Sequence, residues 1–375
     1  MLKREIEDQL LEDLVPGKVV LVYGARRVGK TVLLEQLIEH HKGKVSFLNG
    51  DDYSTELLLS ERTLANYRQL FTDTDLLVID EAQNIKEIGK ILKLIVDGIK
   101  DILVLVSGSS SFDLQNLAGE PLVGRALIYS LFPFSQKELL TNNTRVNLLQ
   151  NIEDSLIYGS YPELLSIPSV IKKQQYLIEI ANSYLLKDIL MVDGIKNSVK
   201  MKDLLRLISF QIGNEVSYEE LGRQLSLSRN TVEKYLDILS KTFVIYKLPA
   251  FSSNPRKEVR KTNKWYFYDN GIRNAVIGDF RALSARNDTG ALWESFLISE
   301  RIKFRSNRRE PANFYFWRTY SGQEIDLIEE FNGELTAFEC KWSKDKVKMQ
   351  SVFKSLYPKA DIRVVNRTNY LDILI

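Results

Sequence analysis

The sequence predicts an α/β protein with several parts: a parallel-sheet domain with a phosphate-binding loop, a helical segment, a helix-turn-helix module and a second α/β domain. Three observations lead to this prediction. An apolar run precedes a glycine-rich loop, G-A-R-R-V-G-K-T, and a helical pattern follows it. A second apolar run ends in Asp80-Glu81, and an Asn332-Gly333 turn joins two strand-like segments. The length of 375 residues accommodates two or three domains of ordinary size.

The composition is that of a soluble globular protein, with 44% hydrophobic and 27% charged residues. No apolar run approaches the roughly 18 residues of a membrane helix. The first residues are charged throughout and lack the apolar centre of a signal peptide. Cys340 is the single cysteine, which excludes an internal disulfide framework, and two adjacent histidines disfavour a histidine-based zinc site or catalytic triad. We therefore expect a cytoplasmic location and no membrane partner.

The net charge is only +2, but the charges are distributed unevenly. Acidic residues outnumber basic ones in residues 1–251, and the reverse holds in residues 252–375. This asymmetry predicts that a polyanion such as DNA binds the C-terminal part. Chance clustering on an ordinary solvated surface is the alternative.

The glycine-rich loop stands in the context that phosphate binding requires. Val19 to Tyr23 is a β-branched apolar run typical of a buried parallel strand, and leucines after the loop recur at helical spacing. Lys30 would reach the β- and γ-phosphates and Thr31 would hold Mg²⁺. A glycine turn before an ordinary helix is the alternative. The expected ATP-binding residues are Gly24, Ala25, Arg26, Arg27, Val28, Gly29, Lys30, Thr31 and Val32.

Two later runs supply the expected partners of this loop. Leu76 to Ile79 is typical of a second buried strand, so Asp80 at its end would bind Mg²⁺, directly or through water. Glu81 would polarise the attacking water. A third run, "DILVLVSGSSS", predicts a strand whose Ser109 lies near the γ-phosphate, with a serine-rich turn as the alternative.

The order of these motifs, continued by "LAGEPLVGRALIYSLFPFSQKEL" and "YGSYPELL", resembles the AAA+ ATPases common in bacteria and archaea. The resemblance implies an ATPase core over residues 1–145 and a helical lid over residues 146–212. It also implies that Arg125 is an arginine finger that acts on a neighbouring subunit, with a homo-oligomer, a hexamer, as the assembly. A structural arginine that pairs with an acid is the alternative. "YGSYPELL" lacks the second sensing arginine that such lids often carry.

Residues 213–270 show helix-turn-helix patterning with a wing. Ser217 and Glu220 form a capping-box pattern, and Ser228 can cap a second helix. This winged helix would bind DNA, although a protein–protein or intersubunit module is the alternative. The expected DNA-binding residues are Arg229, Asn230, Thr231 and Lys234 on the second helix, and Arg256, Lys257, Arg260 and Lys261 in the wing.

The C-terminal part, residues 271–375, contains an acidic hairpin. If Asn332-Gly333 forms a type I′ turn, Phe331 faces Glu334. Asp326 then falls opposite Glu339, and Glu324 falls opposite Lys341. Two acids about 5 Å apart on apolar strands require a cation, and Mg²⁺ or Mn²⁺ suits carboxylate ligands. Lys341 would orient or activate a water, or stabilise a charged transition state.

This D…E-x-K pattern resembles the restriction-endonuclease-like, PD-(D/E)XK, nucleases. The family often adds a glutamate from a preceding helix, and Glu294 fits that place. Ile325 stands where the family's proline would be. Alternatives are an edge hairpin with surface acids, or a fold kept only for DNA binding. The nearby basic residues that would suit a phosphate backbone are Arg301, Lys303, Arg305, Arg308 and Arg309, then Lys344, Lys346 and Lys348.

These parts together predict an ATP-hydrolysing protein that uses Mg²⁺ and acts on DNA. It would remodel branched DNA or move along duplex, with Mg²⁺-dependent cleavage as an added activity. The alternative is a nucleotide-switched regulatory or defence protein, in which the winged helix and the C-terminal part bind partners without cutting DNA.

Overall fold

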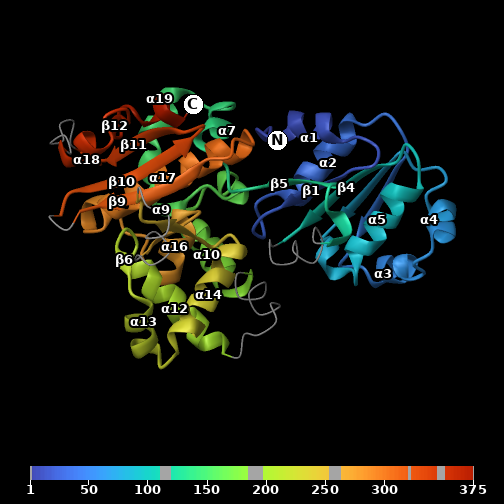
Figure 1. The fold of residues 1–375 in the computed structure, drawn as a ribbon, viewed down its shortest axis with the longest axis horizontal. Helices are drawn as coiled ribbons and strands as arrows, with labels where there is room; N and C mark the ends of the chain where they lie inside the picture. Colours follow the sequence, from blue (N-terminus) through green and yellow to red (C-terminus); the bar gives the residue numbers. More distant parts are fainter. Residues whose placement is uncertain are drawn as a thin grey trace. The chain divides into compact units, whose positions relative to one another are not determined.

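The computed structural model describes residues 2–109, 120–184, 197–252, 263–319, 322–343 and 351–374. The chain divides into two compact units (Figure 1). Unit 1 comprises Lys3–Phe132 with Lys241–Phe243, and unit 2 comprises Pro133–Ser240 with Val244–Ile375. No helix in the described ranges has the length and apolarity needed to cross a membrane.

Unit 1 contains a five-stranded parallel sheet, as the sequence predicts. Its strand order is β2-β3-β4-β1-β5, so β4 lies between the strand before the glycine loop and the strand that ends in Asp80. All carboxyl ends therefore meet at one edge, where ligands bind in open α/β sheets. The strands are β1 (Val19–Tyr23), β2 (Val45–Asn49), β3 (Leu76–Asp80), β4 (Leu103–Gly108) and β5 (Ala126–Ser130).

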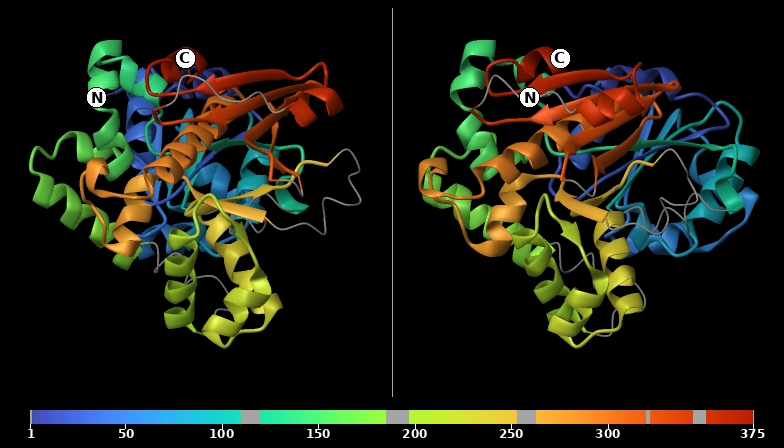
Figure 2. Two further views of the ribbon diagram at one scale, coloured as in Figure 1. Left: turned by 90° about the vertical axis from the view of Figure 1, so that its left-hand side faces the viewer. Right: turned by 60° about the vertical axis from the view of Figure 1, so that its left-hand side comes forward.

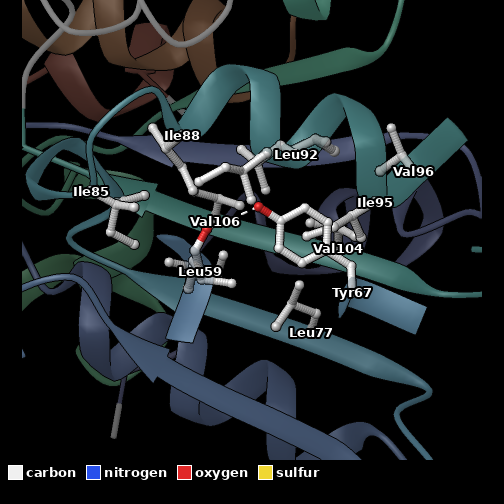
Figure 3. Close-up of a cluster of buried hydrophobic side chains, with 14 of the residues drawn as sticks. Leu59, Tyr67, Leu77, Ile85, Ile88, Leu92, Ile95, Val96, Val104 and Val106 are labelled. Atoms are coloured by element: carbon white, nitrogen blue, oxygen red, sulfur yellow. Dashed lines mark hydrogen bonds between the residues drawn. The ribbon is translucent and has the colours of Figure 1, made fainter. Parts of the chain in front are cut away.

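Helices cover both faces of this sheet (Figure 1). Helix α5 packs with α3 and α4 over alternate residues of β1, β3 and β4, which form one apolar core. Tyr67 is fully buried in this core, and its hydroxyl donates to the carbonyl of Leu59 at 3.0 Å (Figure 3). The helical elements are α1 (Glu7–Asp13), α2 (Lys30–His40), α3 (Tyr53–Ser60), α4 (Leu64–Leu70), the 3₁₀ turns η1 (Ala82–Asn84) and η2 (Glu120–Leu122), and α5 (Ile88–Gly98).

Unit 2 begins with short helices and continues into a helix-turn-helix segment. Helices α13 (Tyr218–Leu225) and α14 (Arg229–Lys241) are followed by the antiparallel strands β7 (Ile245–Pro249) and β8 (Asn263–Phe267). With β6 (Glu215–Val216) they form a sheet of order β6-β8-β7. The preceding elements are α7 (Gln136–Leu140), α8 (Arg145–Gln150), α9 (Ile152–Tyr158), η3 (Pro162–Leu165), α10 (Val170–Glu179), η4 (Ile180–Tyr184) and α12 (Ser198–Phe210).

A four-stranded sheet of order β12-β11-β10-β9 completes unit 2, and α17 runs along it (Figure 2). The backbone N–H of Phe251, just after β7, donates to the carbonyl of Phe316 in β9 at 2.6 Å, which joins the two sheets. The elements are α16 (Asn270–Ile277), η5 (Leu283–Ala285), α17 (Thr289–Asn307), β9 (Asn313–Arg318), β10 (Glu324–Phe331), β11 (Glu334–Cys340), α18 (Ser351–Leu356), β12 (Asp361–Val365) and α19 (Tyr370–Leu374).

The β10–β11 hairpin has the predicted turn and register. Asn332 and Gly333 both have positive φ, 52° and 79°, as a type I′ turn requires, and Phe331 pairs with Glu334. The ladder runs to Leu327↔Phe338. One step further, where the sequence predicts an Asp326–Glu339 pair, the Asp326 carboxylate accepts a hydrogen bond from the backbone N–H of Cys340 at 2.7 Å.

The β10–β11 ladder does not reach the expected Glu324–Lys341 pair, which therefore stays a prediction. Glu324 pairs with Arg318 in β9, and its carboxylate binds the ammonium of Lys264. On the β9 side, β10 contains a β-bulge, where the register shifts between Ile325 and Ile328. These two residues, three apart, pack in the same core cluster, which regular alternation would forbid.

Candidate functional site

The glycine loop after β1 has a backbone that only certain residues can adopt. A Cβ on Gly24 would clash with the carbonyl oxygen of Leu131, and Gly29 has a φ of 94°. Arg27 also lies in the left-handed region, with a φ of 66°. Left-handed residues in such a loop turn successive N–H groups toward one concavity, a geometry that binds anions. The predicted loop therefore has the expected form, with Val28 buried and Val32 partly exposed.

Lys30, the first residue of α2, is aimed into this loop. Its ammonium donates to the carbonyls of Gly24 (3.1 Å) and Ala25 (3.2 Å), and only 5% of the residue is exposed. A buried ammonium needs such acceptors or an anion. A nucleotide's phosphates would supply that anion, because they would lie in the same concavity.

Thr31 and Asp80 come together although they stand on different elements. The Thr31 hydroxyl donates to Asp80 Oδ2 at 2.7 Å, because the ends of β1 and β3 share one sheet edge. The other carboxylate oxygen accepts from the hydroxyl of Ser107 in β4. A hydroxyl next to a carboxylate is the ligand pair that holds Mg²⁺ in phosphate-loop ATPases, so these residues fit that ion.

Glu81 is fixed by residues that the motif analysis did not single out. Its backbone has a φ of 48°, and its N–H donates to the Ser107 hydroxyl at 3.1 Å. Its carboxylate accepts from Gln83 Nε2 at 2.5 Å, while Gln83 Oε1 accepts from the backbone N–H of Ser109 at 3.2 Å. Ser109 is buried next to this network, and its role near the γ-phosphate stays a prediction. The signals that could have indicated these residues are Ser107, polar within an apolar strand, and Gln83, two residues after Glu81.

Arg4 also braces the loop, and nothing in its sequence context indicates this. Its guanidinium donates to the carbonyl of Val28 at 3.1 Å and to that of Phe132, just after β5, at 2.6 Å. The residue is 5% exposed. Arg4 therefore ties the loop to the neighbouring strand end, and removal of its side chain would leave both carbonyls without this donor.

Unit 2 contains a second polar cluster, at the bulged end of β10. The ammonium of Lys341 lies 3.2 Å from Glu339 Oε2 and 3.6 Å from Asp326 Oδ2. Asp326 is 8% and Glu339 3% exposed, and both strands are central in their sheet. The alternative of an edge hairpin with surface acids is therefore wrong. The geometry brings together three of the four residues predicted for a metal-dependent site.

Glu294, the fourth, lies on α17 and has different partners. Its carboxylate accepts from the Tyr266 hydroxyl and lies 3.4 Å from the ammonium of Lys264. Burial, reinforced by the negative charge of Asp326, raises the pKa of Glu294 to about 7. Across the described ranges, no three His, Cys, Asp or Glu residues are grouped so as to hold a metal ion. Asp326 and Glu339 still fit Mg²⁺, which binds through one or two carboxylates plus substrate phosphates.

Three family models match consecutive parts of the chain. Residues 16–140 match the model described as "AAA domain". Residues 149–283 and 289–372 match two models, each described as a domain of unknown function, DUF8612 and DUF4143. Residues 16–140 are therefore similar to an AAA domain in sequence and have the fold of a P-loop ATPase. The match covers the glycine loop, Asp80, Glu81 and Arg125, so this fold implies nucleotide binding at the sheet edge described above.

Relatives and a solved structure extend the similarity over most of the chain. The chain is 26% identical to an uncharacterized protein of Mycobacterium tuberculosis over 343 residues, 90% of this chain and 74% of that protein. An uncharacterized protein of Methanocaldococcus jannaschii is 26% identical over 354 residues, with 88% and 75% covered. The structure of the Walker-type ATPase of Pyrococcus abyssi superposes with a TM-score of 0.50 at 17% identity, covering 74% of this chain and 96% of that one. At this identity the structural match shows the fold alone.

Arg125 lies at the amino end of the five-stranded sheet of unit 1, whereas the glycine loop lies at the carboxyl end. Its carbonyl accepts from the N–H of Val19, the first residue of β1, whereas the loop follows the last. Its guanidinium binds Asp97 through two hydrogen bonds, Nε–Oδ1 at 2.7 Å and Nη2–Oδ2 at 3.0 Å. Arg125 therefore cannot reach its own nucleotide, and its action on a neighbouring subunit stays a prediction.

The predicted DNA-binding residues on α14 are exposed in a surface of mixed charge. Arg229 and Asn230 face solvent and Thr231 is half-buried, but Arg229 pairs with Glu219 at 2.9 Å. Lys234 is exposed on the same helix. Arg256, Lys257, Arg260 and Lys261 lie outside the described residues, as do Lys344, Lys346 and Lys348.

The expectation that the basic residues of α17 contact phosphates is wrong for three of them. Arg301 and Arg305 both bind the buried carboxylate of Glu329, at 2.8 and 2.5 Å. Lys303 is 3% exposed and pairs with Glu300 at 2.8 Å. These cations point inward because α17 packs against the four-stranded sheet, and a buried carboxylate must be paired.

Proposed function

We propose that this protein hydrolyses ATP and that its second unit acts on DNA. The observation that carries the ATPase proposal is the hydrogen bond between Thr31 and Asp80, beside a loop into which Lys30 points. Motif residues from helix α2 and strand β3 meet at one end of the sheet in the arrangement that ATP hydrolysis uses.

Each residue has a distinct role in this proposal. Bound Mg²⁺, held by Thr31 and Asp80, would offset negative charge on the phosphates. Lys30 would exchange its carbonyl acceptors for phosphate oxygens. Glu81 would accept a hydrogen bond from the attacking water and orient it toward the γ-phosphate. Arg125, across a subunit interface, would stabilise transition-state charge in a homo-oligomer, with a hexamer as the expected assembly.

The proposal of DNA action is supported by the order of elements in unit 2. A helix-turn-helix followed by an antiparallel hairpin is the arrangement of a winged helix, which places its second helix in the major groove. Exposed Arg229, Asn230 and Lys234 are residue types that contact phosphates or base edges. Mixed charge on α14 favours the alternative of a protein-binding module, so DNA must be tested directly.

Cleavage of DNA is a second candidate activity, favoured by the Asp326–Lys341–Glu339 cluster. The two carboxylates are buried on central strands and share one ammonium. They would hold Mg²⁺ or Mn²⁺ together with a substrate phosphate, and Lys341 would orient a water or stabilise the leaving oxygen. Glu294 is near enough to influence Asp326 electrostatically.

The decisive experiment measures ATP hydrolysis without DNA and with linear, forked and four-way DNA, alongside strand cleavage in Mg²⁺ and Mn²⁺. DNA-stimulated hydrolysis that is lost in Lys30→Ala supports the proposal. Slow hydrolysis that no DNA changes would replace it with the nucleotide-switched regulatory or defence protein. Cleavage that survives in Asp326→Ala would belong to a contaminant, and its absence in the parent would leave an ATPase that does not cut.

A further inference from the structure

Lys264 is a buried lysine inside the acidic cluster of unit 2. It stands on β8, and 2% of the residue is exposed. Its ammonium binds the carboxylate of Glu324 and lies 3.4 Å from that of Glu294. The ring of Phe316 lies 5.1 Å away and adds a cation–π contact. Every group around this ammonium therefore favours a positive charge.

The partners of Lys264 come from a different part of the chain. Lys264 and Tyr266 belong to the segment that matches DUF8612, whereas Glu294 and Glu324 belong to the segment that matches DUF4143. Tyr266 adds a hydroxyl hydrogen bond to Glu294. The acidic cluster is thus completed by a strand of the helix-turn-helix segment.

The charges of the cluster divide into two halves. Lys264 forms ion pairs with Glu294 and Glu324, whereas Lys341 forms ion pairs with Asp326 and Glu339. Burial lowers the pKa of Lys264, but the two glutamates outweigh burial and raise it above its usual value. The first half therefore contains its own fixed cation, and its carboxylates are already engaged.

We propose that Lys264 is the resident cation of the Glu294–Glu324 half, so that a divalent ion binds only between Asp326 and Glu339. Glu294 is then a positioning residue that sets the field at Asp326, and it does not ligate the metal. The inference rests on the proposed function for the metal, but the role of Lys264 is testable without any metal.

The metal-free test uses a charge rescue. All four tryptophans, Trp265, Trp293, Trp317 and Trp342, lie in unit 2, so tryptophan fluorescence of the full chain reports the unfolding of that unit. Lys264→Met should lower the melting temperature of unit 2, because the largely buried Glu294 and the partly exposed Glu324 lose their cation. Adding Glu294→Gln should recover part of that loss. If the double variant is no more stable than Lys264→Met, the lysine acts only through packing and the proposal is overturned.

A matched control uses Lys303 and Glu300, a second buried pair in the described part of this unit. Lys303→Met removes the partner of Glu300, which is equally buried. It should also lower the melting temperature, but Glu294→Gln should not rescue it. Rescue of both lysine variants would mean that Glu294→Gln stabilises the unit generally, which would contradict the assigned pairing.

The metal test counts bound Mn²⁺ without nucleotide, by electron paramagnetic resonance. The parent should bind one ion, Asp326→Asn should bind none, and Glu294→Gln should still bind one. Lys264→Met should gain a second ion, because Glu294 and Glu324 lose the ammonium that neutralises them. Loss of Mn²⁺ in Glu294→Gln would make Glu294 a ligand and overturn the division. If the parent binds no Mn²⁺, the metal part of the proposed function is refuted, and so is the metal site between Asp326 and Glu339. The stability of Lys264→Met with and without Glu294→Gln would still decide the role of Lys264.

Discussion

Replacement of Gln83 by leucine should slow ATP hydrolysis without weakening nucleotide binding. The Gln83 amide bridges two groups, the carboxylate of Glu81 and the backbone N–H of Ser109. A backbone N–H can only donate, so Oε1 must face Ser109 and Nε2 must face the carboxylate. Leucine preserves the approximate volume but removes both hydrogen bonds.

The magnitude follows from the charge of the acceptor. A hydrogen bond to an ionised group contributes about 1.5–3 kcal/mol. If the hydrogen bond stabilises Glu81 only in the transition state, where Glu81 orients the water, its loss raises the activation free energy by this amount. The value of kcat then falls roughly 10- to 150-fold. The backbone of Glu81 lies in the left-handed region, which costs a non-glycine residue about 1–2 kcal/mol, so its carboxylate depends on such side-chain support.

The assay combines steady-state hydrolysis with equilibrium binding of a fluorescent ATP analogue. The analogue should bind Gln83→Leu as tightly as the parent, because the hydrogen bonds of the Gln83 amide go to Glu81 and Ser109, which belong neither to the glycine loop nor to the Mg²⁺ ligands. Glu81→Gln/Gln83→Leu should hydrolyse no more slowly than Glu81→Gln, because Gln83 acts through Glu81. The control is Asn84→Ala in the same turn, whose side chain donates to Asp51 instead. A parental kcat in Gln83→Leu, or additive losses in the double variant, would refute the reasoning.

Three further predictions concern other parts of the chain. Lys30→Ala should abolish ATP turnover and leave the circular dichroism spectrum unchanged; normal turnover would end the P-loop assignment. Mixing Arg125→Ala with Lys30→Ala subunits should restore some hydrolysis if Arg125 acts across an interface, and a fully active monomer would contradict it. Burial raises the pKa of Asp288, but Arg286 and Arg273 outweigh burial and lower this pKa to about 2. The ionised carboxylate therefore stabilises unit 2 by about 2 kcal/mol at pH values above its usual pKa, and this contribution disappears as the pH falls toward 2. Asp288→Asn should flatten that acid limb in tryptophan-monitored unfolding.

The parts of the structure that sequence predicts well are set by short-range chemistry. The expected strand from Val19 to Tyr23 coincides with β1, because a β-branched run before a glycine loop admits few alternatives. The β10–β11 register follows from the Asn332-Gly333 turn, since two positive φ values fix a two-residue connection. The bulge in β10 was not predictable from the hairpin, because it arises in pairing with β9 and in packing on Phe353.

Residues whose partners are distant in sequence escaped prediction. Arg4 ties the glycine loop to the carbonyl of Phe132, 128 residues from Arg4, and Lys264 binds a carboxylate 60 residues away. Periodicity can place such residues on an element but cannot name what they face. Arg301 is an example. An arginine is a residue type that suits DNA phosphates, yet the guanidinium of Arg301 binds the buried carboxylate of Glu329 on another element.

The same long-range pairs help to hold the last two segments in one compact unit, although they match separate family models. Lys264 on β8 would be a buried ammonium without its carboxylates, and the largely buried Glu294 would lose its cation without Lys264. Either segment therefore needs the other to neutralise its interior charge. The backbone hydrogen bond from Phe251 to Phe316 ties β7 to β9 as well. If the proposed DNA binding and cleavage both occur, a ligand that shifts the β7–β8 hairpin would also move Lys264 and so change the electrostatic field at Asp326.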